Sequence, residues 1–177
     1  MARDLDDLFA YLDALQGRAP LDELKNVLAR CEVEFEDVAR FVRFSERCYQ
    51  RIPLRGGDWF QAWVMCWRNG QRSAIHDHRG SSCGMRVLQG NLTETLFSFA
   101  ANGHVFPTCS REFQPGQVLG GQDADIHQIS NLQAGNADLI TLHVYSPPLH
   151  MMGTFSLTDN LRGEEPMLLD FCDAAGI

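Results

Sequence analysis

The first part of the chain repeats apolar residues at the spacing of an amphipathic helix. One stripe follows the i, i+3, i+4, i+7 and i+10 pattern and consists of Leu5, Leu8, Phe9, Leu12 and Leu15. Gly17 is placed to end this helix, and Pro20 is placed to open a second one. A third, short helix is indicated near residues 38–42. We therefore expect residues 1–47 to form a helical N-terminal segment.

The pattern changes from Asp58 onward to short runs of Val, Ile, Phe and Trp between turn residues. The turn signals are Asn69-Gly70, Gly90-Asn91, Asn102-Gly103, Pro115-Gly116, Gly120-Gly121 and Gly135-Asn136. Such spacing is typical of antiparallel strands in a sandwich or barrel. We expect residues 48–177 to form a β-barrel within a single domain spanning 1–177. After Pro148 the pattern is less regular, so this stretch is expected to wrap around the barrel.

Composition narrows the possible partners. The 177 residues are 45% apolar, carry a formal net charge of -8 and have a pI of about 5.1. No run of Lys and Arg is present, which disfavours nucleic acid and anionic membranes as partners. The acidic N-terminus lacks the apolar core of a signal peptide, and no apolar run reaches the ~20 residues needed to span a bilayer. We expect a soluble, cytoplasmic monomer.

The cysteines are scattered and show no CxxC spacing. They are Cys31, Cys48, Cys66, Cys83, Cys109 and Cys172. This distribution argues against a disulfide framework and against a structural zinc site. Cys83 alone is distinguished by its neighbours, because it follows closely after a pair of histidines.

His76-Asp77-His78 is the first candidate for chemistry, because it lies where a strand is expected to end. Residues i and i+2 of a strand point to the same face, so the two imidazoles would project side by side. An HxH pair is a weak signal alone, and imidazole suits Zn, Cu, Fe and Ni. His104, expected in an exposed turn, and His150 have no matching role.

A second candidate lies in the strand expected at residues 141–148. Period two places Thr141, His143 and Tyr145 on one face and apolar residues on the other. A polar row is costly to bury unless its members are hydrogen-bonded. The row is therefore either part of a site or a satisfied buried network without catalytic use.

Two motifs resemble those of the cupin superfamily. The first is Gly70, His76-x-His78, Cys83 and Gly90; the second is Pro115-Gly116, Gly121 and His127-x-x-x-Asn131. The resemblance implies a mainly β fold, a cupin (jelly-roll) β-barrel with N-terminal α-helices. It also implies that His127 is the third metal ligand. Cys83 stands where most cupins carry a glutamate ligand, which disfavours a zinc-dependent isomerase.

A closer resemblance covers roughly residues 48–149. The stretches IHDHRGSSCGMRVLQGNLTETLF, HQISN and LHVYSPP resemble type I cysteine dioxygenases. The resemblance implies an Fe(2+) ion held by His76, His78 and His127. It also implies that L-cysteine and O2 are the substrates and that a sulfinate is the product.

The same resemblance implies roles for the residues around the metal. Family members carry a thioether between a cysteine and a tyrosine, which correspond here to Cys83 and Tyr145. Thr141 takes a position usually filled by serine, and His143 is expected to orient the tyrosine. Ser146-Pro147 is the expected site of a cis peptide bond.

The resemblance also suggests how the substrate carboxylate is bound. Tyr49 and Arg51 correspond to the family's Tyr-x-Arg, and a guanidinium binds a carboxylate with two parallel hydrogen bonds. Arg55 is close enough in sequence to compete. Gln50 lies one residue from the position where mercaptopropionate dioxygenases carry glutamine. The alternatives are a dioxygenase of another thiol, such as 3-mercaptopropionate, and a non-catalytic cupin that binds a small molecule.

Overall fold

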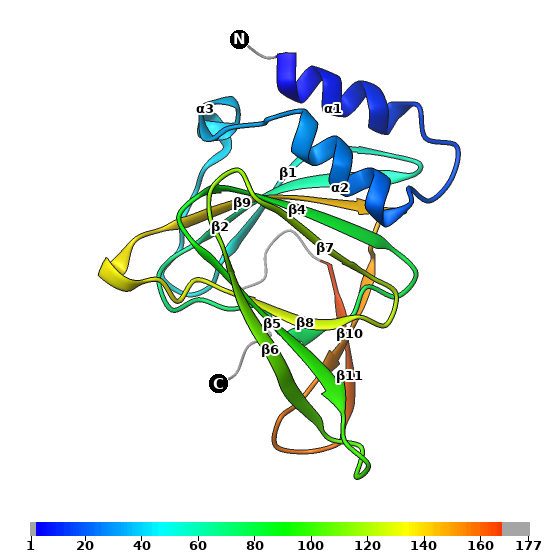
Figure 1. The fold of residues 1–177 in the computed structure, drawn as a ribbon, viewed down its shortest axis with the longest axis vertical. Helices are drawn as coiled ribbons and strands as arrows, with labels where there is room; N and C mark the ends of the chain where they lie inside the picture. The colour runs from blue at the N-terminus through cyan, green and yellow to red at the C-terminus, as the bar shows by residue number, and fades with distance from the viewer. Residues whose placement is uncertain (1–2, 168–177) are drawn as a thin grey trace.

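The N-terminal helices lie across one side of two facing β-sheets (Figure 1). The computed structural model describes residues 3–167. Its helical elements are α1 (Arg3–Asp13), α2 (Leu21–Arg30), α3 (Phe35–Val38) and the 3-10 turns η1 (Ala39–Phe41) and η2 (Ala134–Asn136). Pro20 is the N-cap of α2, as expected from the sequence. The N-terminal α-helices expected from the sequence are confirmed, and the boundary at residue 47 stays a prediction.

The strands of the described part form two antiparallel sheets. They are β1 (Gln50–Gly57), β2 (Phe60–Trp67), β3 (Ile75–His76), β4 (Ser82–Gln89), β5 (Leu92–Phe99), β6 (Val105–Phe113), β7 (Val118–Gln122), β8 (Ile126–Ser130), β9 (Leu139–Ser146), β10 (Met151–Phe155) and β11 (Arg162–Pro166). One sheet has the order β1-β2-β9-β4-β7, and the other has the order β11-β10-β3-β8-β5-β6. The predicted mainly β barrel with N-terminal helices is confirmed.

The central strands of the first sheet are buried on both faces. On β2, Val64 and Cys66 pack with the helices, whereas Met65 and Trp67 face the space between the sheets. On β9, Leu142 and its alternate neighbours likewise pack toward the helices. This arrangement explains why β9 is buried along its whole length while carrying polar side chains at every second position.

Helix α2 packs directly on β4, and Gly84 makes this contact possible. A Cβ atom on Gly84 would lie 2.6 Å from Cδ1 of Leu28 and 3.0 Å from Cγ of Leu24. Two residues further on, the buried Arg86 donates from Nε to the carbonyl of Val33 (2.8 Å) and from Nη1 to the carbonyl of Leu28 (3.2 Å). A cation near the last carbonyls of a helix also interacts favourably with the helix dipole.

Two expectations from the sequence are wrong. Gly120-Gly121 is not a turn but lies inside β7, because only glycine fits there. A Cβ on Gly120 would lie 2.5 Å from the carbonyl oxygen of Cys83, and one on Gly121 would lie 3.1 Å from Cε1 of His78. The stretch after Pro148 is also more regular than expected, since it forms the hairpin of β10 and β11.

The other local expectations agree with the structure. The remaining turn signals fall between strands, and the Ser146-Pro147 peptide bond is cis.

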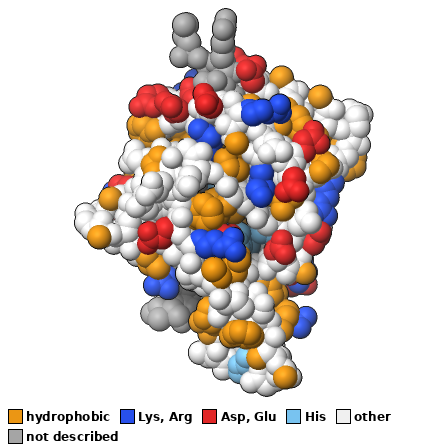
Figure 2. Space-filling model, viewed as in Figure 1, with side chains coloured by type: hydrophobic (Ala, Val, Ile, Leu, Met, Phe, Trp, Pro, Cys, Tyr) orange, Lys and Arg blue, Asp and Glu red, His pale blue; other side chains and the backbone are white. Residues whose placement is uncertain are grey.

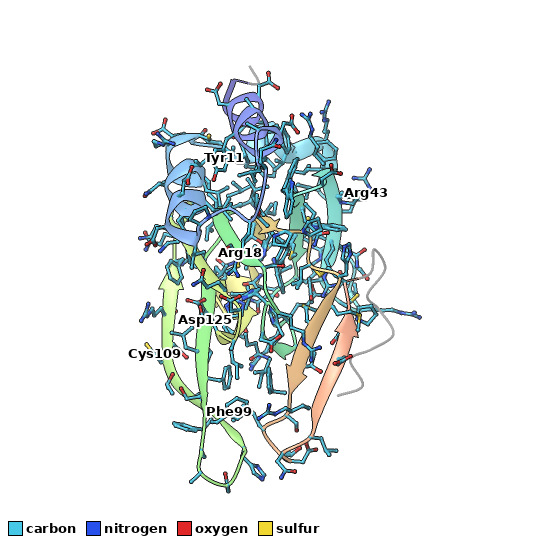
Figure 3. The ribbon with its side chains drawn as sticks, turned by 90° about the vertical axis from the view of Figure 1, so that its right-hand side faces the viewer. Tyr11, Arg18, Arg43, Phe99, Cys109 and Asp125 are labelled. Atoms are coloured by element: carbon cyan, nitrogen blue, oxygen red, sulfur yellow. The ribbon has the colours of Figure 1, made fainter. Side chains whose placement is uncertain are left out.

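No disulfide links the cysteines of residues 3–167. Cys109 projects from the exposed strand β6 (Figure 3), and Cys172 lies outside the described residues. None of the described helices is long and apolar enough to cross a membrane. On the face of the molecule shown in Figure 2, acidic and basic side chains are mixed and form no large patch of one sign.

The close approach of α2 to β4 predicts that Gly84→Ala is destabilising. Because the added methyl group would overlap two leucines of α2, the helix must shift, and such overpacking costs about 1–3 kcal/mol. Urea unfolding of the variant measures this loss. Gly17→Ala is the matched control, since nothing lies within 4 Å of its added Cβ, and it should not lower stability. Equal stability of the Gly84 variant and the wild type would contradict the described packing.

Candidate metal centre

Three buried histidines converge between the two sheets. His76 on β3 is the register partner of His127 on β8, and His78 follows directly after β3. Their ring centroids lie 4.7 to 5.4 Å apart. One nitrogen from each ring lies within 4.8 Å of the others. The strand register therefore brings together the histidine pair and the distant third histidine.

The hydrogen bonds of these rings leave a nitrogen of each available to a metal ion. Nδ1 of His76 donates to the carbonyl of Ala74 (2.9 Å), and Nδ1 of His127 donates to Oε1 of Glu94 (2.9 Å). Each of these two rings then presents Nε2 with a lone pair. Both ring nitrogens of His78 are buried without a hydrogen-bond partner among residues 3–167. A buried polar atom is costly to leave unpaired, so the donor set fits a transition-metal ion.

Burial also keeps the imidazoles of His76 and His78 neutral. The pKa of His76 is lowered to about 3, first by desolvation and then by the neighbouring His127. The pKa of His78 is likewise held well below its usual value, first by burial and then by the other histidines. Because only the neutral ring can bind a metal, these lone pairs are available at neutral pH.

Glu94 was not identified from the sequence as a functional residue. It is 5% exposed, and its carboxylate accepts the hydrogen bond that orients the ring of His127. The signal was its position on β5, two residues after the buried Leu92. Period two places both residues on the inward face, where a carboxylate requires a partner.

Cys83 and Tyr145 lie opposite each other on β4 and β9. They are register partners, both are buried, and their side chains are in hydrogen-bonding contact. Burial raises the pKa of the Cys83 thiol and the pKa of the Tyr145 hydroxyl, so both groups are neutral at pH 7 in the metal-free protein. The candidate ligand group formed by the three histidines does not include Cys83.

The polar row on β9 is connected by hydrogen bonds. Nε1 of Trp67 donates to Oγ1 of Thr141 (3.1 Å), and this hydroxyl lies within hydrogen-bond distance, 2.9 Å, of Nε2 of His143. Burial lowers the pKa of His143 well below its usual value, which keeps the ring neutral. Its buried Nδ1 has no partner among residues 3–167.

Arg51 and Tyr49 line the same cavity as His76 and His127. The buried Arg51 donates from Nη2 to the hydroxyl of Tyr49. The ring of Tyr49 stacks on Trp67, with centroids 4.0 Å apart and 12° between the planes. Arg55, the competing candidate, instead pairs with Asp13 at the surface (2.6 Å).

One cavity joins most of the predicted site residues; His78 and Thr141 are not part of its lining. Its lining includes His76, His127, His143, Cys83, Tyr145, Tyr49 and Arg51, together with the apolar side chains Met65, Trp67, Met85, Ile129, Met152 and Met167 and with Ser73. Gln50 does not line it. His104 is half-buried just before β6, and His150 is exposed, so neither belongs to the site.

A family model agrees with this arrangement. The model of cysteine dioxygenase type I matches residues 2–158. The chain belongs to this family. The cysteine dioxygenase type 1 of Rattus norvegicus is 30% identical over 159 residues, which cover 86% of this chain and 79% of the relative. The human protein of the same name is 28% identical over the same shares.

Solved structures show the same fold at lower identity. A structure from Thermus thermophilus has a TM-score of 0.53 and 19% identity, covering 65% of this chain and 98% of that protein. A Klebsiella pneumoniae protein with a double-stranded β-helix domain has a TM-score of 0.52 and 18% identity, covering 62% of this chain and 81% of its own. The chain therefore shares its fold with these proteins, and it is a member of the cysteine dioxygenase type I family with a three-histidine metal site.

The neutral buried histidines predict how the stability of the metal-free protein depends on pH. Their pKa values are lower in the folded protein than in the unfolded chain, so the unfolded chain binds more protons between about pH 6.5 and the folded pKa. Stability should therefore fall as pH falls from about 6.5, by up to about 1.4 kcal/mol per pH unit for each such histidine. Urea unfolding at a series of pH values measures this slope.

His76→Gln should reduce this slope, because one buried titrating group is removed. A stability that stays constant between pH 7 and pH 5 would contradict the neutral, buried state of His76, His78 and His143.

Proposed function

We propose that this protein is an iron(II)-dependent dioxygenase that oxidises L-cysteine with O2 to cysteine sulfinate. The observation that carries the proposal is the joining, in one cavity, of a three-histidine metal site and a buried arginine. The metal site would bind the thiol group of a substrate, and the arginine would bind a carboxylate. L-Cysteine carries both.

His76, His78 and His127 would hold the ion. Because an imidazole that binds a metal carries no charge, the site keeps the full charge of a divalent ion, and an anionic thiolate restores charge balance. Bound iron would supply positive charge that lowers the pKa of the substrate thiol, together with open positions for the thiol and O2. The choice of iron over other imidazole-binding metals rests on family membership.

Arg51 would bind the substrate carboxylate, with Tyr49 holding the guanidinium in place. The stacking of Tyr49 on Trp67 fixes the phenol, and the phenol accepts a hydrogen bond from Arg51. The protein therefore fixes the orientation of the guanidinium plane, which is what two parallel hydrogen bonds to a carboxylate require. Binding both ends of a small thiol would place its sulfur beside the histidines, which reduces the entropic cost of reaction.

Tyr145 would be the neutral hydrogen-bond donor of the reaction. Tyr145 lines the cavity, and burial keeps its hydroxyl protonated. His143 would position it, since the contacts from Trp67 through Thr141 hold the ring of His143 in place. The apolar side chains around the cavity would exclude bulk water from the reacting atoms.

We also propose a thioether between Cys83 and Tyr145. Formation would remove the thiol hydrogen and one ring hydrogen and would require O2 as the two-electron oxidant. The register pairing and hydrogen-bonding contact of the two side chains support it. The crosslink would hold the hydroxyl of Tyr145 in one orientation. The cytoplasmic, monomeric state expected from composition stays a prediction.

The proposed function predicts oxygen consumption and sulfinate formation when the iron-loaded protein is mixed with L-cysteine. Arg51→Ala should raise KM by roughly 10- to 150-fold, because a charge-assisted hydrogen bond is worth about 1.5–3 kcal/mol. Arg55→Ala removes an equal charge at the surface and is the control, with KM unchanged. An unchanged KM for the Arg51 variant would remove it from this role.

Turnover of 3-mercaptopropionate without turnover of L-cysteine would assign the protein to the alternative thiol dioxygenase. Metal binding without oxygen consumption on any thiol would instead favour a non-catalytic cupin. The presence of Arg51 in the cavity, with Gln50 outside its lining, favours cysteine between the two thiols.

The thioether predicts a mass change. After turnover, the intact mass should fall by the mass of two hydrogen atoms, and Cys83→Ser should abolish the loss. Cys66→Ser is a matched control, because this buried cysteine faces the helices rather than Tyr145. A wild-type protein that turns over with both residues unmodified would show that no crosslink is needed.

A further inference from the structure

The loop between helices α1 and α2 contacts the barrel where β4 begins and where β7 and β9 end. Arg18 of this loop donates from Nε to Oγ of Ser82 (3.0 Å), the first residue of β4. Its Nη1 and Nη2 donate to the two carboxylate oxygens of Asp123, which follows β7, at 2.6 and 3.0 Å. The next residue, Ala19, donates from its backbone N–H to Oγ of Ser146 (2.9 Å), the last residue of β9. Figure 3 shows Arg18 at this junction of the helices and the barrel.

The two serines flank the pair that we propose to form the thioether. Ser82 and Ser146 are fully buried register partners, and the next register pair is Cys83 with Tyr145. Neighbouring residues of a strand point to opposite faces, so the serines face the loop while Cys83 and Tyr145 face the cavity. The contacts from the loop therefore hold the backbones of β4 and β9 at the point where the cysteine meets the tyrosine.

Asp123 connects Arg18 with a metal ligand. Its backbone carbonyl accepts hydrogen bonds from the backbone N–H groups of His78 (2.9 Å) and Arg79 (3.1 Å). The φ of Asp123 is 52°, a left-handed conformation that a residue other than glycine keeps only with support from its surroundings. Unlike the other two ligand rings, the ring of His78 has no hydrogen-bond partner among residues 3–167. The position of this ring therefore follows that of its backbone.

We propose that Arg18 is a positioning residue of the metal centre. Through Asp123 it holds the backbone of His78. Through Ser82 it holds the start of β4, next to Cys83. The part that concerns the thioether rests on the proposed function, whereas the part that concerns His78 rests on the metal site alone. Because Arg18 and Asp123 are partly exposed, their ion pair adds little to overall stability, so its loss should alter the site without unfolding the protein.

The sign of the effect on metal binding distinguishes positioning from charge. Arg18 is a cation, so removing it would by charge alone strengthen the binding of a metal cation. Loss of positioning has the opposite effect, because His78 is then no longer held where the other two ligands require it. The direction in which the Kd of a metal ion changes therefore reports which of the two effects acts.

The test titrates Co²⁺, a divalent ion that imidazole ligands bind, into the metal-free protein by calorimetry. For Arg18→Ala we expect the Kd to rise by about three- to tenfold. This is less than the roughly 10- to 100-fold effect of groups that contact a ligand directly, because Arg18 acts through Asp123. Arg18→Lys keeps the charge but cannot hold Ser82 and both oxygens of Asp123 at once, so its Kd should rise as well. In the iron-loaded variants with L-cysteine, the loss of two hydrogen masses that marks the thioether should be slower than in the wild type.

Arg55→Ala is the matched control, because Arg55 also connects the helical segment to the barrel but does so at β1, through Asp13 (2.6 Å). Its Kd for Co²⁺ should equal that of the wild type. An unchanged or lower Kd in Arg18→Ala, or an equal rise in Arg55→Ala, would overturn the proposal. A wild type that consumes no oxygen with L-cysteine would overturn the proposed function, whereas the Co²⁺ Kd values would still decide the role of Arg18.

Discussion

The rest of the structure depends on burying three imidazoles side by side inside a barrel. Two of the rings are oriented through Nδ1, one by the carbonyl of Ala74 and one by the carboxylate of Glu94. The third, His78, has both nitrogens buried without a partner in the described chain, so a bound ion would satisfy a polar atom that the fold leaves unpaired. Gly121 lies where a larger side chain would crowd this third ring.

The helices make such a polar interior possible. They cover the outer face of the five-stranded sheet, so its central strands bury apolar side chains on that side and keep the inner face for chemistry. Strand β9 shows this division most clearly, with Leu142 toward the helices and His143 toward the cavity. Tyr49 stacks on Trp67 and accepts a hydrogen bond from Arg51, so the packed interior also holds the arginine that would bind the substrate.

Much of the architecture could be predicted from the sequence, because it depends on local periodicity. The helical stripes, the inward pair at His76 and His78 and the polar row on β9 follow from periods of 3.6 and 2. The third ligand, His127, came only from the family motif, since its contact with His76 depends on the pairing of β3 with β8. Glu94 was missed for the same reason.

The errors also have a physical origin. Gly120-Gly121 has the composition of a turn, but the backbone of β4 and the ring of His78 require small residues inside a strand. The hairpin of β10 and β11 is stabilised by pairing with residues far away in the chain, which no local pattern reveals.

The central claim is that three imidazoles hold an iron ion that binds the substrate sulfur. X-ray absorption spectroscopy of the iron-loaded protein tests it most directly, with and without L-cysteine in the absence of oxygen. The account predicts three imidazole ligands in the free protein and a new sulfur ligand when L-cysteine is added. Fewer than three imidazoles, or no sulfur ligand at saturating L-cysteine, would contradict it.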